Sequence, residues 1–239
     1  YADFHERALF NHLLASQDPQ DGWACYMVPV GRGVQREYER NMLDGGFTCC
    51  VGSSMESHAL HGHGLYYEAG DKLWVNLYAP STAQWPAAGV KLDMQTDFPA
   101  GESATLQLTV DSPQEFTIAL RRPFWAGAGW SVKINGEALA VESPAAARSA
   151  GGDARRGTSS STPPASSFVE VKRTWQTGDT IALTLPKTLR LEPLPDNPRR
   201  VAILWGPLVL AGDLGPDGDV RGREPGVNPL DQVPVFVAA

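Results

Sequence analysis

The chain has 239 residues, of which 42% are hydrophobic, and a formal net charge of −7. This length predicts one large domain or two smaller ones, and no apolar run is long enough to form a membrane-spanning helix. The negative charge argues against a nucleic-acid-binding surface, because neutralising phosphates requires clustered Lys and Arg.

The first 16 residues predict a helix, since Leu9 and Leu13, like Phe10 and Leu14, follow the i, i+4 spacing of a single helical face. The segment "DPQDG" at 18–22 ends this helix with Pro and Gly. Because the chain opens inside a helical pattern and closes on the strand-like "VPVFVAA", we expect it to be a piece of a longer protein.

Two of the three cysteines are adjacent, in the stretch "GGFTCCVGSSMESH" at 45–58. An odd number of cysteines at this spacing does not fit a disulfide framework and favours a reducing compartment or a metal role. A helix is expected after the pair, with Ser53 or Ser54 as its cap and its end near Gly62 and Gly64.

Cys49 and Cys50 allow several interpretations from the residues alone. Thiolates bind Zn²⁺ well, and glycines such as Gly45, Gly46 and Gly52 would let an extended backbone kink so that both sulfurs reach one ion. A strained vicinal disulfide, a nucleophile or two inert buried side chains are the other options. The residues by themselves leave these options open.

From about residue 65 the hydrophobic period changes to two. Alternating runs predict strands near residues 73–78, 90–94, 106–110, 116–120, 168–174, 180–185, 188–192 and 200–210. Asn135-Gly136 predicts a type I′ hairpin turn between two further strands. Many short strands without intervening helices indicate an antiparallel β-sandwich.

Two segments lack the pattern of a packed element. Residues 143–167 have almost no large apolar side chain, so we expect a disordered insertion there. Residues 212–239 begin with a stretch rich in Gly, Pro and Asp, and we expect a linker and the start of a truncated C-terminal module.

Six segments occur in an order that resembles glycoside hydrolase family 127, typified by β-L-arabinofuranosidase. They are "YADFHERALFN", "GGFTCCVG", "LYYEAGDKLWVNLYAPS", "FTIALRRPFWAG", "VKINGE" and "VAILWGPLVLAG". The resemblance extends over nearly the whole chain except 143–167. The resemblance implies a multidomain α + β protein. Residues 1–68 would be the C-terminal portion of an (α/α)6 catalytic barrel, and 69–211 the β-sandwich that follows it.

The same resemblance implies a function and a site. Such enzymes are retaining glycosidases that release terminal β-L-arabinofuranose or a related furanose from an oligosaccharide or glycoside. A Zn²⁺ is held by a Glu-x-Cys pair and by two adjacent cysteines, of which the first is the nucleophile. The matching residues are Cys49, as nucleophile and zinc ligand, and Cys50, as zinc ligand.

The chain departs from the family pattern in two places. It contains no Glu-x-Cys, so two zinc ligands and the acid/base Glu are expected upstream, and the chain alone should hydrolyse nothing. Val51-Gly52-Ser53 stands where arabinofuranosidase-type members can have Pro-Pro-Asn, which leaves the sugar open. The alternative functions are a non-catalytic carbohydrate-binding or structural sandwich and, ranked last, a redox switch at the cysteine pair.

Other residues receive structural interpretations. His58 and His61 could share a helical face and reach a metal, but partly exposed residues at a helix end are favoured. Glu6 and Arg7 are expected in surface or inter-helix ion pairs, and Glu56 in a structural role. Core or inter-domain packing is favoured over sugar stacking for the tryptophans of the sandwich region, which are Trp74, Trp85, Trp125, Trp130 and Trp175.

Overall fold

A computed structural model describes residues 1–26, 38–40, 47–141 and 165–211 of the chain. The chain divides into two units. The first unit comprises Tyr1–Glu6 and Gly62–Thr188, and the second comprises Arg7–His61 and Leu189–Ala239. The division falls inside the first helix, between Glu6 and Arg7.

The N-terminal helical segment changes its winding along its length. It runs through an α-helix (α1, Ala2–Ala8), a π-helical turn (η1, Leu9–Leu13) and a 3₁₀ turn (η2, Leu14–Ser16). The predicted helix over residues 1–16 is therefore confirmed. The remaining helices of the described residues are α2 (Cys49–Ala59) and the short 3₁₀ turn η4 (Pro86–Ala88).

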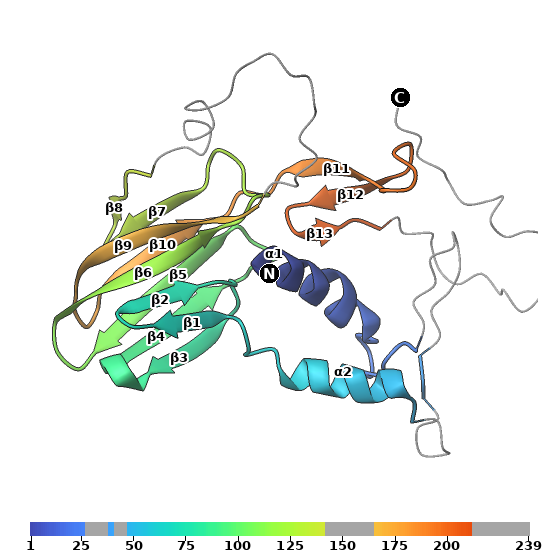
Figure 1. Cartoon of the computed structure of the whole chain (residues 1–239), viewed down its shortest axis with the longest axis horizontal. Coiled ribbons are helices and arrows are strands. Elements are labelled where there is room, and N and C mark those ends of the chain that lie inside the picture. Colours follow the sequence, from blue (N-terminus) through green and yellow to red (C-terminus); the bar gives the residue numbers. More distant parts are fainter. Residues whose placement is uncertain (27–37, 41–46, 142–164, 212–239) are drawn as a thin grey trace, which may run out of the picture. The chain divides into compact units, whose positions relative to one another are not determined.

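The described part of the chain is mostly β-sheet (Figure 1). A four-stranded sheet has the order β1 (Tyr66–Ala69), β2 (Lys72–Val75), β6 (Gln114–Arg122) and β9 (Ser167–Trp175). A six-stranded sheet has the order β3 (Ser81–Trp85), β4 (Val90–Thr96), β5 (Ser103–Val110), β10 (Thr180–Thr184), β7 (Ser131–Ile134) and β8 (Glu137–Ala138). In the second unit, β11 (Leu189–Pro193), β12 (Val201–Trp205) and β13 (Leu208–Val209) form a third sheet.

The first two sheets pack face to face as a β-sandwich. Strict alternation in β5 buries every second side chain, and β4 begins with the same pattern. Aromatic rings meet across the interface, since Trp85 of β3 lies 5.7 Å from Phe116 of β6 between ring centroids. Within the four-stranded sheet, Phe116 lies 5.9 Å from Trp175 of β9. Burial of these alternating side chains from both sheets forms the hydrophobic core.

The sandwich confirms most of the predicted strands. Asn135 and Gly136 have φ of 52° and 86°, so both central residues of the turn between β7 and β8 are left-handed, as a type I′ turn requires. The sequence pattern missed β1 and β3, whose burial does not alternate clearly. It also missed that β2 and β6 pair in parallel, whereas the other pairings of the described strands are antiparallel.

Four of the five tryptophans in the sandwich region are core residues. Trp85, Trp125, Trp130 and Trp175 are 4%, 3%, 5% and 0% exposed, which confirms the packing role expected for them. Trp74 of β2 is different, because its side chain lies on the outward face and is half-buried.

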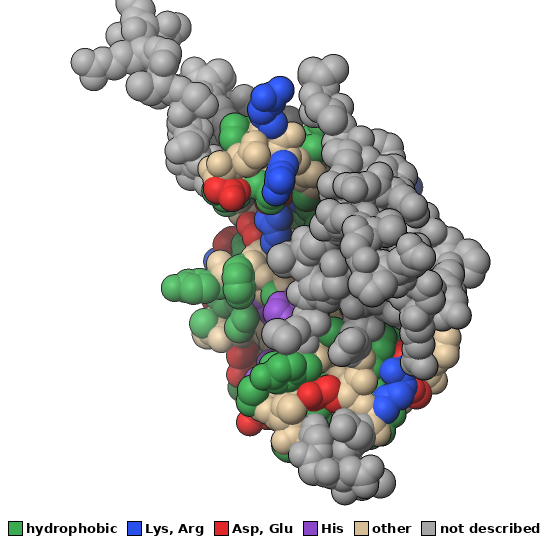
Figure 2. Space-filling view, turned by 90° about the vertical axis from the view of Figure 1, so that its right-hand side faces the viewer, with side chains coloured by type: hydrophobic (Ala, Val, Ile, Leu, Met, Phe, Trp, Pro, Cys, Tyr) green, Lys and Arg blue, Asp and Glu red, His purple; other side chains and the backbone are tan. Residues whose placement is uncertain are grey.

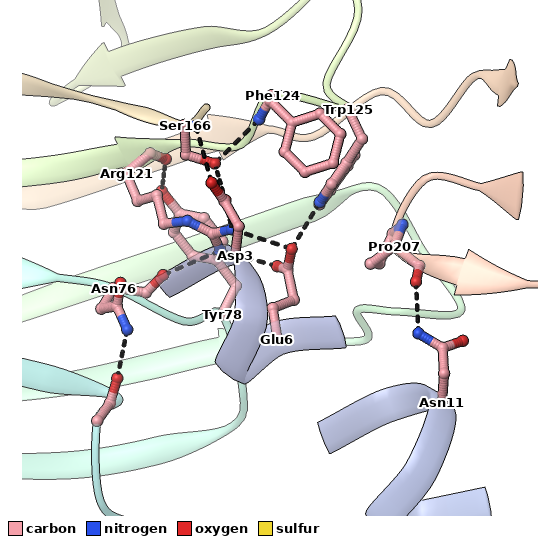
Figure 3. A network of polar contacts seen from close by, with 11 residues as sticks. Asp3, Glu6, Asn11, Asn76, Tyr78, Arg121, Phe124, Trp125, Ser166 and Pro207 are labelled. Atoms are coloured by element: carbon pink, nitrogen blue, oxygen red, sulfur yellow. Dashed lines mark hydrogen bonds and ion pairs between the residues drawn. The ribbon is translucent and has the colours of Figure 1, made fainter. Parts of the chain in front are cut away.

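A buried ionic network joins the beginning of α1 to the sandwich within the first unit (Figure 3). Arg121 of β6 is fully buried, and its Nη1 and Nη2 donate to the two carboxylate oxygens of Glu6 at 2.9 and 3.1 Å. Nη2 also donates to Asp3 at 2.6 Å, and the Trp125 indole donates to Glu6 at 2.6 Å. The expected surface ion pair of Glu6 is therefore wrong, because this carboxylate is 2% exposed and binds a partner 115 residues away.

The network keeps its arginine charged. Burial alone would lower the pKa of Arg121, but the carboxylates of Glu6 and Asp3 hold that pKa above its ordinary value. Tyr78, in the loop between β2 and β3, adds a contact to the network, since its hydroxyl donates to the Arg121 backbone carbonyl at 2.5 Å. Burial raises the pKa of Tyr78, so its hydroxyl stays protonated as a donor.

The residues after the predicted insertion also belong to this network. Ser166 donates its backbone N–H to Asp3 at 3.0 Å, and its hydroxyl both donates to Asp3 and accepts the Phe124 N–H. Ser167 begins β9. The expected disorder is therefore wrong for Ser166 and Ser167, whereas 142–164 lie outside the described residues.

In the second unit, polar contacts join the N-terminal helical segment to the third sheet. Asn11 of η1 donates to the Pro207 carbonyl at 2.8 Å and accepts the Val209 N–H at 2.7 Å, which ties η1 to β13. Arg7 and Glu192 form an exposed ion pair, as expected for Arg7. None of the helices in the described residues has the length and apolar character needed to span a bilayer. The predicted linker at 212–239 lies outside the described residues.

Replacing Arg121 should destabilise the chain strongly. Arg121→Met leaves the Glu6 carboxylate buried with only the Trp125 N–H, and breaking a buried ion pair on one side costs about 3–5 kcal/mol. Lys172→Met, which removes an exposed pair with Glu115 at 3.3 Å, is the control and should cost under about 1 kcal/mol. Urea unfolding measures both, and equal small losses would show that the network does not stabilise the fold.

Asp3 should make stability depend on pH. Burial raises the pKa of Asp3, but hydrogen bonds from Ser166 and Arg121 lower it by more, so it lies below its ordinary value of 3.8. A depressed folded-state pKa stabilises the fold above the unfolded value, and this contribution is lost as the pH falls through the folded value. The difference in unfolding free energy between the parent and Asp3→Asn should therefore shrink below about pH 4. A difference that stays constant from pH 6 to pH 3 would contradict this.

Candidate functional site

The cysteine pair opens helix α2 of the second unit. Thr48 is the N-cap residue, with extended φ and ψ of −94° and 172°, and the Gly52 N–H donates to the Thr48 carbonyl at 3.2 Å. The helix therefore begins before Ser53 and Ser54, and the cap predicted at these serines is wrong. Cys49 and Cys50 lie in the first turn of a helix. The sequence had suggested instead a kinked extended segment made possible by the nearby glycines.

The two sulfur atoms converge although they belong to neighbouring residues. Side chains at i and i+1 of a helix do not normally face each other, yet the Sγ atoms of Cys49 and Cys50 are 3.9 Å apart. Cys49 is exposed and Cys50 is half-buried. The outer sulfur is thus open to a reactant, while the inner sulfur is oriented towards the protein.

This separation fits one tetrahedral metal ion. Two thiolates on the same Zn²⁺ lie about 3.8 Å apart, because each Zn–S bond is about 2.3 Å long. The sulfurs at 3.9 Å match that value without rearrangement. The described residues contain no group of three or more His, Cys, Asp or Glu side chains able to hold a metal ion, so any further ligands lie outside them.

Glu39 lies beside the pair and was not identified from the sequence. Its carboxylate accepts the Thr48 hydroxyl at 2.7 Å, and its backbone N–H donates to the Ala24 carbonyl at 3.0 Å. Glu39 thus contacts the N-cap residue Thr48, although the two residues are nine positions apart in the sequence. The surrounding sequence "QREYERNM" reads only as a charged, exposed stretch, so no local signal marks Glu39.

Negative neighbours make Cys50 a poor thiolate in the absence of a cation. Partial burial, the Cys49 thiol, Glu39 and the buried Cys25 all raise the pKa of Cys50. The first-turn position, which favours anions through the helix dipole, does not offset them. A cation at the pair would reverse this balance, because it stabilises the thiolate directly.

The two histidines expected on one helical face do meet. The Nδ1 atom of His58 lies 2.8 Å from Nε2 of His61, so one ring donates and the other accepts. Both rings are half-buried, and His63 is exposed. No third ligand group completes a metal site with them among the residues that the structure describes.

Thiol alkylation should distinguish the two cysteines. Exposed Cys49 should react with iodoacetamide before Cys50, whose raised pKa lowers its thiolate fraction at pH 8. Glu39→Gln removes one of the negative neighbours and should speed the alkylation of Cys50 roughly twofold. Peptide mass spectrometry measures both rates. Glu56→Gln, an exposed acid on the same helix, is the control, and equal acceleration by both variants would contradict the role of Glu39.

Two family models match different parts of the chain. Residues 1–63 match the family model of the catalytic domain of β-L-arabinofuranosidase, glycoside hydrolase family 127. Residues 72–187 match the model of the middle domain of the same family. No protein among the curated sequences compared matches the chain.

Several solved structures share the fold. Ara127N-Se, a GH127 β-L-arabinofuranosidase from Geobacillus stearothermophilus T6, is 25% identical with a TM-score of 0.64, over 87% of this chain and 32% of that one. A protein named only as a glycoside hydrolase is 19% identical with a TM-score of 0.65, over 87% and 33%. The GH127 β-arabinofuranosidase BT3674 is 20% identical with a TM-score of 0.65, over 87% and 32%.

The chain spans about a third of the length of these solved structures. The two family models match consecutive segments in the order catalytic domain, then middle domain, and together they cover the cysteine helix and the sandwich. The chain therefore belongs to glycoside hydrolase family 127.

Proposed function

We propose that this chain carries the nucleophile of a retaining glycosidase that releases terminal β-L-arabinofuranose or a related furanose. The observation that supports this most directly is the exposed Cys49 sulfur in the first turn of α2, 3.9 Å from that of Cys50. Both cysteines lie within the match to the catalytic domain of the family. In this proposal residues 1–68 are the end of a helical catalytic barrel.

Cys49 and Cys50 would hold a Zn²⁺ together with two ligands from outside this chain. The spacing of their sulfurs and the Glu39 carboxylate near Cys50 support a cation there. When bound, the ion would keep both thiols deprotonated at neutral pH and fix their direction. Ligands for the remaining positions are not available from this sequence, which contains no Glu-x-Cys.

The reaction assigns the covalent step to Cys49. Its sulfur attacks the anomeric carbon of the terminal sugar, the bond from that carbon to the leaving oxygen breaks, and a carboxylic acid gives its proton to that oxygen. Water then attacks the same carbon, loses a proton to the carboxylate and releases the thiolate. Two displacements at one carbon retain the configuration of the sugar.

Cys50 and Glu39 would position this nucleophile without forming a bond to the sugar. Cys50 is half-buried next to Cys49, and the Glu39 carboxylate fixes the start of the helix through the Thr48 hydroxyl. Val51, the next residue, is 4% exposed and packs inward. The departure from Pro-Pro-Asn at 51–53 therefore begins with a core residue. Other residues of the sugar-binding site would then determine which furanose is bound.

The full-length protein should lose its glycosidase activity when the sulfur of Cys49 is removed. Cys49→Ser should lower kcat/KM on an aryl β-L-arabinofuranoside by at least about a thousandfold, because a serine hydroxyl is a far weaker nucleophile at neutral pH. Glu56→Gln, an exposed residue of the same helix, should retain activity within about threefold.

Two further measurements accompany these kinetics. A fluorinated or otherwise slow furanoside should leave its sugar on Cys49, visible as added mass on the peptide that contains it. The 239-residue chain alone should show no turnover, because the acid/base residue and two metal ligands are absent from it. Turnover by the chain alone, or by full-length Cys49→Ser, would refute the proposal.

A further inference from the structure

We propose that Tyr67 and Trp74 form a saccharide-binding platform on the outward face of the four-stranded sheet, separate from the cysteine site. The substrate class rests on the glycosidase function proposed above. The platform belongs wholly to the first unit, whereas the cysteine pair belongs to the second. Its role would be to hold a glycan chain, not to cleave it.

The sheet register places the two aromatic residues side by side. Tyr67 of β1 is the direct cross-strand partner of Trp74 of β2, so both side chains lie on the same face. The other face of β2 carries Leu73 and Val75, which are 4% and 0% exposed in the sandwich core. Tyr67 is 55% exposed, and Trp74 is half-buried. The pair is thus outside the core that buries the other four tryptophans.

Charged groups line one side of the pair. The Lys72 ammonium lies over one face of the Trp74 ring, 5.5 Å from its centroid, and 2.6 Å from a carboxylate oxygen of Glu170 on β9. The intervening strand β6 presents the small side chains of Thr117 and Ala119 in register with these residues. The Lys72–Glu170 pair therefore crosses above β6 and places hydrogen-bonding groups next to the aromatic rings.

The other side of the pair is polar as well. Gly64 has a φ of +76°, and a Cβ there would lie 2.8 Å from ring atoms of His5 and 3.0 Å from the Tyr67 hydroxyl. The imidazole and the phenol thus converge over this glycine, which is the one residue type that leaves them room. The platform carries an imidazole and a hydroxyl at one end, and an ammonium and a carboxylate at the other.

This combination matches a sugar better than a protein partner. A sugar ring presents C–H groups that pack on aromatic faces, while its hydroxyls bond to polar groups at the edge, as in the general pattern of ligand sites. The centres of protein–protein interfaces are instead depleted in Lys and Glu. Figure 2 shows in green the hydrophobic side chains on one face of the molecule. The exposed hydrophobic residues of the second unit include Phe47, Met55 and Leu60.

Affinity electrophoresis of the 239-residue chain tests the platform. The probes are a soluble arabinan that bears arabinofuranose and, for comparison, dextran. Arabinan should retard the parent chain, and Trp74→Ala or Tyr67→Ala should each raise the dissociation constant about tenfold or more. Trp74→Phe, which keeps an aromatic ring, should stay within about threefold of the parent. Thermal unfolding of each variant verifies that the sandwich remains folded.

Two control variants fix the location of binding. Phe168→Ala removes an exposed ring from β9, at the opposite edge of the same sheet, and should leave the affinity unchanged. Cys49→Ala should also bind normally, which separates this platform from the cysteine site. The platform is overturned if the parent does not bind arabinan, if Trp74→Ala binds as well as the parent, or if Phe168→Ala or Cys49→Ala binds as weakly as Trp74→Ala. Failure of the glycosidase proposal is read separately, from turnover by full-length Cys49→Ser.

Discussion

The buried guanidinium of Arg121 is the constraint on which the arrangement of the first unit depends. A charge with no exposed surface is tolerated only when it is paired and hydrogen-bonded, and here Glu6 and Asp3 supply both carboxylates. These partners come from the catalytic-domain match at residues 1–63, whereas Arg121 comes from the middle-domain match at 72–187. The start of α1 therefore folds as part of the sandwich unit, and it does so because Arg121 would otherwise be an uncompensated buried charge.

Helix α1 connects this constraint to the rest of the catalytic segment. Its first residues belong to the sandwich unit, and Arg7 and Ala8 continue the same helix into the second unit. The π-helical turn that follows widens the helix at Leu9–Leu13, where Asn11 contacts the third sheet. π-Helical turns often occur near functional sites. A single short helix is thus part of both units. Its first residues form the buried ion pairs with Arg121, and the π-helical turn after it makes polar contacts with the third sheet.

The cysteine pair shows how the start of a helix can bring the sulfurs of two adjacent residues together. Thr48 ends the extended backbone, and the first turn brings the sulfurs of Cys49 and Cys50 to 3.9 Å. Glu39 fixes Thr48 and adds negative charge beside Cys50. As proposed, the cysteine pair would hold a cation, whereas the aromatic platform on the sandwich would bind a neutral, hydroxylated ligand. The two sites therefore suit two different tasks, one chemical and one of binding.

The sequence by itself determined the elements whose signal is local. Alternation of apolar residues marked most strands, and Asn135-Gly136 marked a type I′ turn because few other pairs adopt two left-handed residues. Only the tertiary structure decided the partners. That Glu6 pairs with Arg121, that β2 runs parallel to β6, and that Glu39 lies beside the cysteines depend on contacts between distant segments. Periodicity reports how far a side chain is buried, but the partner that compensates its charge is chosen by packing across the whole fold.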